Sequence, residues 1–489
     1  MSGVELFLDK SQISWERNIQ RELCQPVKYD KNPVLLPEYP WEESYVCLYG
    51  SILPKKSERG FFMWYMAAGN HGKDQTMCLA ESDDGLAWRK VFSGEHPYGQ
   101  DRETNIVYGP NPNIHGPCVL HNYHDEISDE RYLVLYDSYS RYRPDLTEVQ
   151  GSGRWCYTAT SPDGLHWFPP TGRPAIPGKS DTGQGVVWDP IKKRYIAYLR
   201  GTRSPHDPFG SPHGETQRVR YVRASVSRDF RTWSSPIELL RADNQDGDPN
   251  HQIHQLSVTW RDGQFIGLLS MFHIHDFLKM RDDDGKPLLM EEGTCDTQLV
   301  VSRDGMHWHR VADRQLFLPL GLPGEWDSQW IVTASQIVVD QNRMLFYYAA
   351  TDKKRSEGHR YQIGVAALPL DRFQALKPLD KSRPAVLETK PVYLLDGDLY
   401  INADCSQGNI LMELCDFNGN TIEGFGKENC TPVVEDNLRY IVRWNNKKIS
   451  EARNETLFRQ AIRIRCYIDR ASLYAIYLPA ADAWENDNG

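Results

Sequence analysis

Alternating apolar and polar positions recur along the first three quarters of the chain, in short runs typical of β-strands. The runs form groups in which two longer patterns precede a shorter one that ends in a turn. The first group covers residues 45–53, 60–66 and 77–80, and four more groups start near residues 116, 185, 252 and 331. Each group predicts a four-stranded meander, and five such units predict a five-bladed β-propeller.

A turn motif with the pattern S-x-D-(G/F)-x-x-W follows the third strand pattern in four of the five units. It occupies residues 82–88, 161–167, 227–233 and 302–308, at near-even intervals that indicate a repeat architecture. The Asp of such a turn can accept hydrogen bonds from backbone N–H groups of its own turn, and the Gly supplies an unusual φ angle. We therefore assign structural roles to Asp84, Asp163, Asp229 and Asp304.

The repeat ends near residue 373, which suggests a domain boundary. Residues 1–376 are assigned to the propeller, and residues 377–391, rich in Pro and Lys, are predicted to form a linker. Short strand patterns within residues 392–489 predict a C-terminal β-sandwich. The fifth unit lacks an evident fourth strand, and the apolar run at residues 4–8 is predicted to supply it. The expected fold class is therefore all-β: a five-bladed β-propeller followed by a C-terminal β-sandwich.

Charge and composition exclude several classes of function. The formal net charge is −10, and the basic runs are short, which argues against a nucleic-acid surface. No apolar run approaches the roughly 20 residues of a membrane span, and residues 1–30 have no apolar core of a signal peptide. The 10 Cys lie scattered without C-x-x-C pairs, as is usual in a reducing compartment. We expect a cytoplasmic protein without nucleic-acid or membrane partners, whose sandwich packs on the propeller or forms homo-oligomer contacts.

The repeated blades and the appended sandwich resemble the five-bladed propeller enzymes of glycoside hydrolase families 32, 43, 68, 117 and 130. The layout is most similar to family 32, and residues 41–50 and 63–65 are similar to the opening blade of relatives of the group. The resemblance implies a glycosidase that removes a terminal sugar, such as a furanoside, from a short oligosaccharide or glycoside. The chain carries neither the N-D-P-N-G nor the R-D-P motif of family 32, so candidate residues are chosen by their position in the blades.

In this enzyme group the active site lies on the face of the propeller where the innermost strands begin. Residues just before a first strand or just after a second strand are therefore candidates. Glycoside cleavage needs a proton donor and a carboxylate that acts as base or nucleophile. The predicted catalytic carboxylates are Glu43, Asp181 and Asp327, and we expect them to converge so that the pKa of at least one is raised. The predicted substrate-binding residues are Trp41, His115, Arg200, Asp248, His251, His254, His273, Glu325 and Gln329.

Two other functions are compatible with the same sequence. In an intracellular glycoside phosphorylase, which needs a single acid, phosphate would be bound by Arg200, Arg203, His251 and His254. A non-catalytic propeller that binds carbohydrate or protein is the other alternative. Several histidines gather in the fourth blade, but no thiol or H-E-x-x-H pattern accompanies them. We therefore expect them to contact sugar or the core, and we expect no metal and no cofactor.

Overall fold

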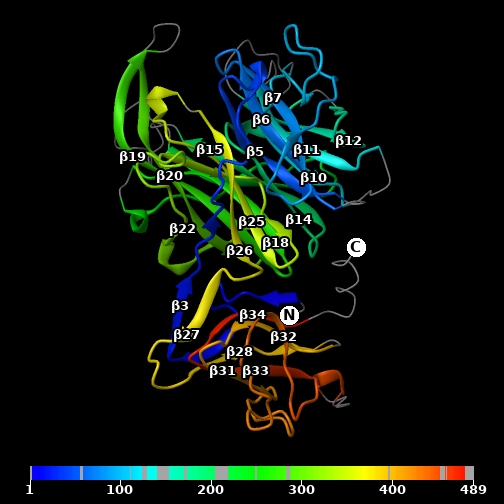
Figure 1. Cartoon of the computed structure of the whole chain (residues 1–489), viewed down its shortest axis with the longest axis vertical. Coiled ribbons are helices and arrows are strands. Elements are labelled where there is room, and N and C mark those ends of the chain that lie inside the picture. The colour runs from blue at the N-terminus through cyan, green and yellow to red at the C-terminus, as the bar shows by residue number, and fades with distance from the viewer. Residues whose placement is uncertain are drawn as a thin grey trace.

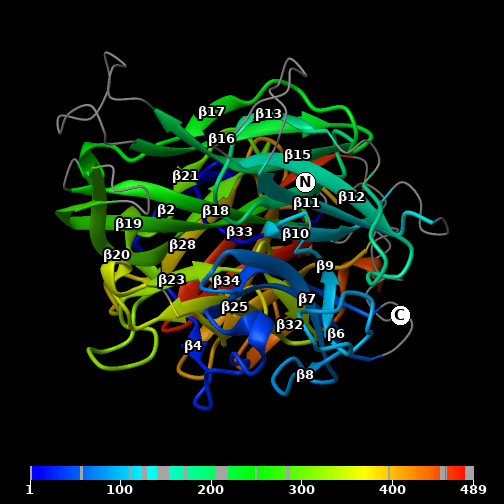
Figure 2. The same ribbon diagram turned by 90° about the horizontal axis from the view of Figure 1, so that it is seen from above.

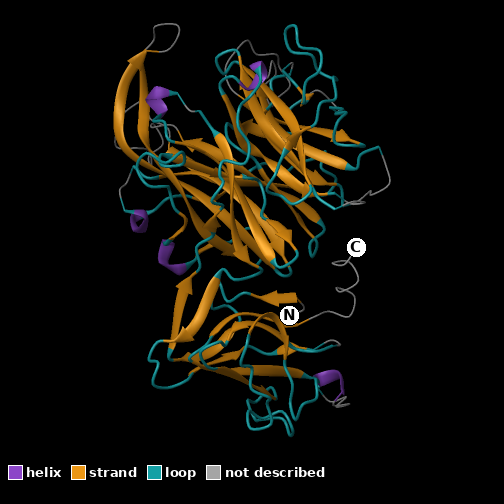
Figure 3. Ribbon diagram, viewed as in Figure 1, coloured by secondary structure: helices purple, strands orange, loops and turns teal. Residues whose placement is uncertain are grey.

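The computed structural model of the 489-residue chain describes residues 3–55, 59–110, 112–123, 129–139, 154–169, 173–203, 219–247, 250–281, 287–358, 360–394, 397–451, 457–458 and 460–478. Two β-rich bodies stack along the long axis of the molecule, the propeller above and the sandwich below (Figure 1). Within the described ranges, helical structure is confined to short 3-10 turns (Figure 3). These are η1 (Pro40–Glu42), η2 (Asn244–Asp246), η3 (Ala312–Arg314), η4 (Arg355–Glu357) and η5 (Ile449–Glu451). None of these described helices is long or apolar enough to cross a membrane.

The first three blades are antiparallel sheets whose strands follow one another along the chain. Blade 1 consists of β5 (Tyr45–Pro54), β6 (Phe61–Gly69), β7 (Asp74–Ser82) and β8 (Arg89–Lys90), with β9 (Ile106–Tyr108) also on β7. Blade 2 consists of β10 (His115–His121), β11 (Tyr132–Tyr139), β12 (Arg154–Ser161) and β13 (Ile176–Lys179). Blade 3 consists of β14 (Gly185–Asp189), β15 (Arg194–Arg203), β16 (Val219–Ser227) and β17 (Ile237–Leu240).

The last two blades keep the same order of strands, with additions at their edges. Blade 4 consists of β18 (Gln252–Arg261), β19 (Gln264–Arg281) and β20 (Pro287–Ser302), with β21 (His309–Arg310) and β22 (Leu316–Leu318) on the outer side of β20. Blade 5 consists of β23 (Trp330–Thr333) and β24 (Val338–Asp340), β25 (Arg343–Thr351), β26 (Gln362–Pro369) and β4 (Val27–Lys28). Seen from above, the five sheets lie around a common centre (Figure 2). The predicted five-bladed propeller is confirmed.

The strands of the blades are apolar on both faces because each blade packs between two others. In β6, for example, every residue is buried except Phe62, which is half-buried. Separate apolar clusters fill the spaces between successive blades. The alternation expected from the sequence therefore holds only in part, because burial on both faces makes strands such as β6 nearly continuous apolar runs.

The sandwich consists of two sheets that enclose a single apolar cluster. One sheet contains β3 (Ile19–Leu23), β27 (Gln374–Pro378), β34 (Ser472–Leu478), β30 (Tyr400–Asp404) and β32 (Asp436–Ile441), with β1 (Gly3–Glu5) on β34. The other contains β2 (Ile13–Arg17), β28 (Ala385–Thr389), β33 (Ala461–Asp469) and β29 (Val392–Tyr393), with β31 (Asn409–Cys415) on β33. The predicted sandwich is thus present, and both ends of the chain contribute to it.

Two details of the predicted domain boundaries differ from the structure. The segment 377–391 is not a linker, because it contains part of β27 and all of β28, which pair with β3 and β33 inside the sandwich. The run 4–8 does not complete blade 5, because β1 pairs with β34 in the sandwich instead. The outer strand of blade 5 is β4, where Val27 faces Ala367 of β26. Both errors arose because pairing over long sequence distances leaves no local periodicity.

The S-x-D turns have the structural role predicted for them. In blade 2, Asp163 accepts hydrogen bonds from the N–H groups of Leu165 and His166, both at 2.9 Å. Gly164 has a φ of 81°, and its carbonyl accepts a hydrogen bond at 2.8 Å from the indole of Trp64 in blade 1. Asp84, Asp229 and Asp304 accept the equivalent pair of backbone bonds. The turns therefore stabilise the ends of the blades, on the face opposite to the start of the inner strands.

We expect Asp163→Ala to lower the free energy of unfolding by about 1 to 2 kcal/mol, because two backbone N–H groups lose a charged acceptor. Urea denaturation of the purified variant measures this change. The matched control is Asp83→Ala: its side chain is 70% exposed and pairs with Arg89, so we expect a loss below about 0.5 kcal/mol. Equal stability of the two variants would contradict the assignment.

Candidate active site

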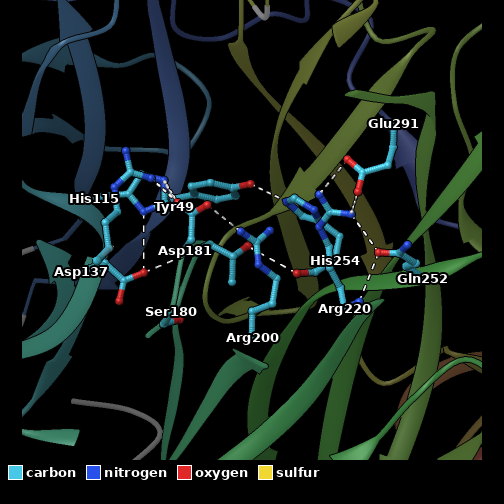
Figure 4. A network of polar contacts seen from close by, with 12 residues as sticks. Tyr49, His115, Asp137, Ser180, Asp181, Arg200, Arg220, Gln252, His254 and Glu291 are labelled. Atoms are coloured by element: carbon cyan, nitrogen blue, oxygen red, sulfur yellow. Dashed lines mark hydrogen bonds and ion pairs between the residues drawn. The ribbon is translucent and has the colours of Figure 1, made fainter. Parts of the chain in front are cut away.

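Charged side chains from blades 2 and 3 meet at the face where the inner strands begin (Figure 4). Asp181 lies in the loop before β14, and its carboxylate is bound by Arg154, the first residue of β12. Arg200, near the end of β15, binds the other carboxylate oxygen at 2.9 Å. His115, the first residue of β10, places its Nε2 4.0 Å from Asp181. The prediction placed Asp181, His115 and Arg200 on this face, and the structure brings these three together.

Asp181 is strongly acidic, contrary to the prediction that converging carboxylates would raise a pKa. Burial alone would raise the pKa of Asp181, but the charges of Arg200, of His115 once it is protonated at low pH, and of Arg154 outweigh burial and lower the pKa to about 2. The side chain nevertheless remains 57% exposed. A carboxylate that is ionised, firmly held and still open to solvent is available to a ligand.

A buried carboxylate lies behind His115. Asp137 of β11 is fully buried and accepts hydrogen bonds from Gln184 Nε2 at 2.7 Å and from the Thr182 N–H at 3.4 Å. Its Oδ2 lies 3.7 Å from His115 Nδ1. Burial and the charge of Arg154 lower the pKa of His115, so its imidazole is neutral at neutral pH. Asp137 and His115 thus form a rigid support beside Asp181.

An aromatic pair lies across the site from blades 1 and 4. The Tyr49 hydroxyl and His254 Nε2 are hydrogen-bonded at 2.6 Å, and both residues are buried. The His254 ring meets Trp330 edge-on with 5.2 Å between centroids, and its backbone carbonyl lies 3.4 Å from Thr182 Oγ1. Tyr49 also contacts the edge of His115. The prediction of His254 as a residue of this face is consistent with this arrangement.

A second arginine–carboxylate group lies beside His254 (Figure 4). Arg220 of β16 donates to Gln252 Oε1 at 2.8 Å and to both oxygens of Glu291 at 3.3 Å. Arg355 of η4 binds the same Glu291 carboxylate at 3.1 Å. Burial lowers the pKa of Arg220 to about 10, and the positive charge of Arg200 contributes to this shift. The two arginine groups are therefore close enough to interact.

Glu43 and Asp327 do not converge with Asp181 in the described part of the chain. Glu43 is 49% exposed at the edge of blade 1, where it faces His71. Asp327 is buried and binds Lys28 Nζ of β4 at 2.7 Å and the Tyr348 hydroxyl at 3.1 Å. Because Lys28 belongs to the outermost strand of blade 5, Asp327 stabilises the attachment of that strand. The prediction of three converging carboxylates was wrong.

Several predicted substrate-binding residues have structural contacts instead. Trp41 is buried, stacks on Tyr39 and donates to Asn105. Glu325 is exposed and accepts the N–H of Leu322 within its own turn. The Gln329 backbone joins blades 4 and 5, since its carbonyl accepts the Cys295 N–H and its N–H donates to Thr351. Asp248 lies outside the described residues.

His251 and His273 of blade 4 form a separate pair. Their rings meet edge-on with 4.5 Å between centroids. His251 Nδ1 is bonded to the carbonyl of Asp246 at 2.7 Å, and His273 Nε2 lies 3.0 Å from Asp296. Among the described residues, no group of three or more His, Cys, Asp or Glu side chains could hold a metal ion.

The prediction missed Arg154 and Arg220 for a simple geometric reason. It considered the starts of first strands and the ends of second strands, but third strands also start on this face. Arg154 begins β12 and Arg220 is the second residue of β16. Applied to the third strands, the same argument would have found both arginines.

Some solved structures are similar to this chain in backbone. A glycosyl hydrolase from Bacteroides ovatus shares 13% identity with a TM-score of 0.47, over 73% of this chain and 98% of its own. A β-1,2-mannobiose phosphorylase from Listeria innocua shares 10% with a TM-score of 0.45, over 72% and 97%. An N-acetylgalactosamine deacetylase from F. plautii shares 13% with a TM-score of 0.46, over 72% and 96%. No protein-family model and no curated protein sequence matches the chain.

We expect the Asp181 carboxyl to show no titration above pH 3, because its pKa is about 2. An unfolded Asp titrates near 3.9, so the stability that this group contributes is complete above about pH 4 and is lost as the pH falls toward 2. Carbon-13 NMR of labelled Asp measures the titration. Arg200→Gln should raise the pKa of Asp181, because a neighbouring positive charge is removed.

The control for this titration is Arg194→Gln, at the far end of the same strand, where Arg194 pairs with Asp189. It should leave the Asp181 signal unchanged. A wild-type Asp181 signal that titrates above pH 4 would contradict the binding of this carboxylate by Arg154 and Arg200.

Proposed function

We propose that the protein is a carbohydrate-active enzyme that cleaves a glycosidic bond at this face of the propeller, with Asp181 as the reacting carboxylate. The observation that carries the proposal is the state of Asp181: it is ionised, fixed by Arg154 and Arg200, and more than half exposed. In glycoside cleavage, one carboxylate attacks the anomeric carbon or activates the attacking water, while positive charge develops on the sugar ring. An ionised Asp181 suits this role at any physiological pH.

The residues around Asp181 divide into those that touch a sugar and those that support them. Arg200 and the Tyr49–His254 pair offer hydrogen-bonding groups beside Asp181. Asp137 is fully buried and lies 3.7 Å from His115, so we assign it a positioning role. It orients His115, which in turn lies against Asp181.

The reaction we propose first is hydrolysis of a terminal sugar from a small oligosaccharide or glycoside. Hydrolysis also requires a group that protonates the leaving oxygen. The bond that breaks joins the anomeric carbon to the leaving oxygen, and water supplies the new hydroxyl and the proton.

Phosphorolysis is the second candidate reaction, and one observation favours it. Asp181 is the single solvent-facing carboxylate of its group among the described residues, and it lies between two arginines. Arginines bind phosphate oxygens well. In this reaction inorganic phosphate would replace water as the attacking group and the product would be a sugar phosphate.

We expect Asp181→Asn to reduce kcat/KM by about 1,000-fold or more on any glycoside that the wild type cleaves, because the carboxylate charge at the reacting carbon is lost. A panel of nitrophenyl glycosides and disaccharides identifies the substrate. Glu43→Gln is the matched control and should retain full activity, since Glu43 faces His71 at the edge of blade 1. Undiminished activity of a folded Asp181→Asn variant would remove this residue from the mechanism.

The panel also separates the two reactions when it is run with and without inorganic phosphate. We expect turnover to be independent of phosphate, because water is the attacking group in the hydrolysis that we propose. Strict dependence on phosphate, with release of a sugar phosphate, would establish phosphorolysis instead. Binding of sugars without any turnover would indicate a non-catalytic propeller.

A further inference from the structure

Two carboxylates at the candidate active site are each held between two arginines. Asp181 is bound by Arg154 and Arg200, and Glu291 is bound by Arg220 and Arg355. In the view of Figure 4, the guanidinium of Arg200 lies between Asp181 and Arg220. Arg200 of the first group and Arg220 of the second are thus directed toward each other. Among the residues drawn, no carboxylate lies between them.

Arg200 has hydrogen-bonding capacity that the described part of the protein does not use. Its side chain is 9% exposed, and Nη2 binds Asp181 at 2.9 Å. Its Nε is buried and has no hydrogen-bond partner among the described residues. Buried guanidinium N–H groups are usually satisfied, and one left without an acceptor is costly. An acceptor supplied by a ligand would satisfy it.

The balance of charge indicates that this acceptor is an anion. In the described part of the chain, four guanidinium groups, of Arg154, Arg200, Arg220 and Arg355, share two carboxylates, of Asp181 and Glu291. Burial lowers the pKa of Arg220 most, and the positive charge of Arg200 lowers it further, so the two arginines repel each other. A negative group placed beside both would remove this repulsion.

We propose that the Arg200–Arg220 region binds the carboxylate of an acidic sugar, so that the substrate is a uronic acid glycoside. A guanidinium presents two parallel N–H donors that match the two oxygens of a carboxylate. The inference rests on the proposed function for the reaction, but sugar binding tests it independently of catalysis.

The test is calorimetric titration of the wild-type protein with glucuronate and galacturonate, each compared with glucose, galactose and the methyl ester of the uronate. We expect at least one uronate to bind about 10-fold more tightly than its neutral counterparts, because an ion-paired carboxylate replaces an uncharged group. Arg200→Gln should remove this preference, and Arg194→Gln, which changes the far end of the same strand, should retain it. The methyl-ester comparison needs no variant, so it decides the question even if Arg200→Gln fails to fold.

Equal affinity of the wild type for the uronates and their neutral counterparts would overturn the inference. So would inorganic phosphate that binds the same site more tightly than either uronate. Failure of the proposed function looks different, since a uronate would then bind with the expected preference while no glycoside is cleaved. Cleavage of neutral glycosides without any preference for acid would leave the function intact and exclude the acidic subsite.

Discussion

The propeller depends on hydrogen bonds that cross from blade to blade around its centre. Polar groups on the inner strands lie between packed sheets, and buried groups of this kind must find partners. Every boundary has such a bond: Val119 N–H to Ser51 Oγ (2.8 Å), Gln184 to Asp137 (2.7 Å), Thr182 to the His254 carbonyl (3.4 Å), Gln255 to the Thr333 carbonyl (2.9 Å), and Ser335 N–H to the Gly50 carbonyl (2.9 Å). The apolar clusters between blades supply the burial, while these directional bonds determine how each blade is aligned with the next.

Two of these bonds also determine where the candidate active site lies. Thr182 and Gln184 attach the loop before β14 to blades 2 and 4, and Asp181 is the residue directly before Thr182. The carboxylate of Asp181 is therefore presented by a loop that is fixed on both sides. Residues that hold the ring together and residues that would meet a substrate are neighbours in sequence, so changes to the ring will also affect the site.

The sequence predicted the repeat architecture well because the strand patterns and the S-x-D turns are local signals. The turn needs only its own Asp and its own backbone, as Asp163 illustrates. The rule on strand ends was sufficient for Asp181, His115 and Arg200, since strand direction decides on which face they lie. It failed for Asp327, whose partner Lys28 is about 300 residues away in sequence and belongs to a strand that no periodicity revealed. Loop conformations and long-range pairs are decided by packing, which a single sequence does not display.

The sandwich is attached to the propeller away from the candidate site. The contacts that hold the two bodies together are therefore separate from the residues that would bind a ligand. Arg303, in the S-x-D turn of blade 4, binds Glu5 and Asp9 from the N-terminal segment. Arg261 of β18 binds the buried Asp371, which also accepts a hydrogen bond from Tyr477 of β34. These contacts lie at the turn end of blade 4, whereas Asp181 lies where the inner strands begin. A role of the sandwich in homo-oligomer contacts stays a prediction. Within the chain, the sandwich anchors the ends of blades 4 and 5. It thereby leaves the face with the arginines and Asp181 open to a ligand.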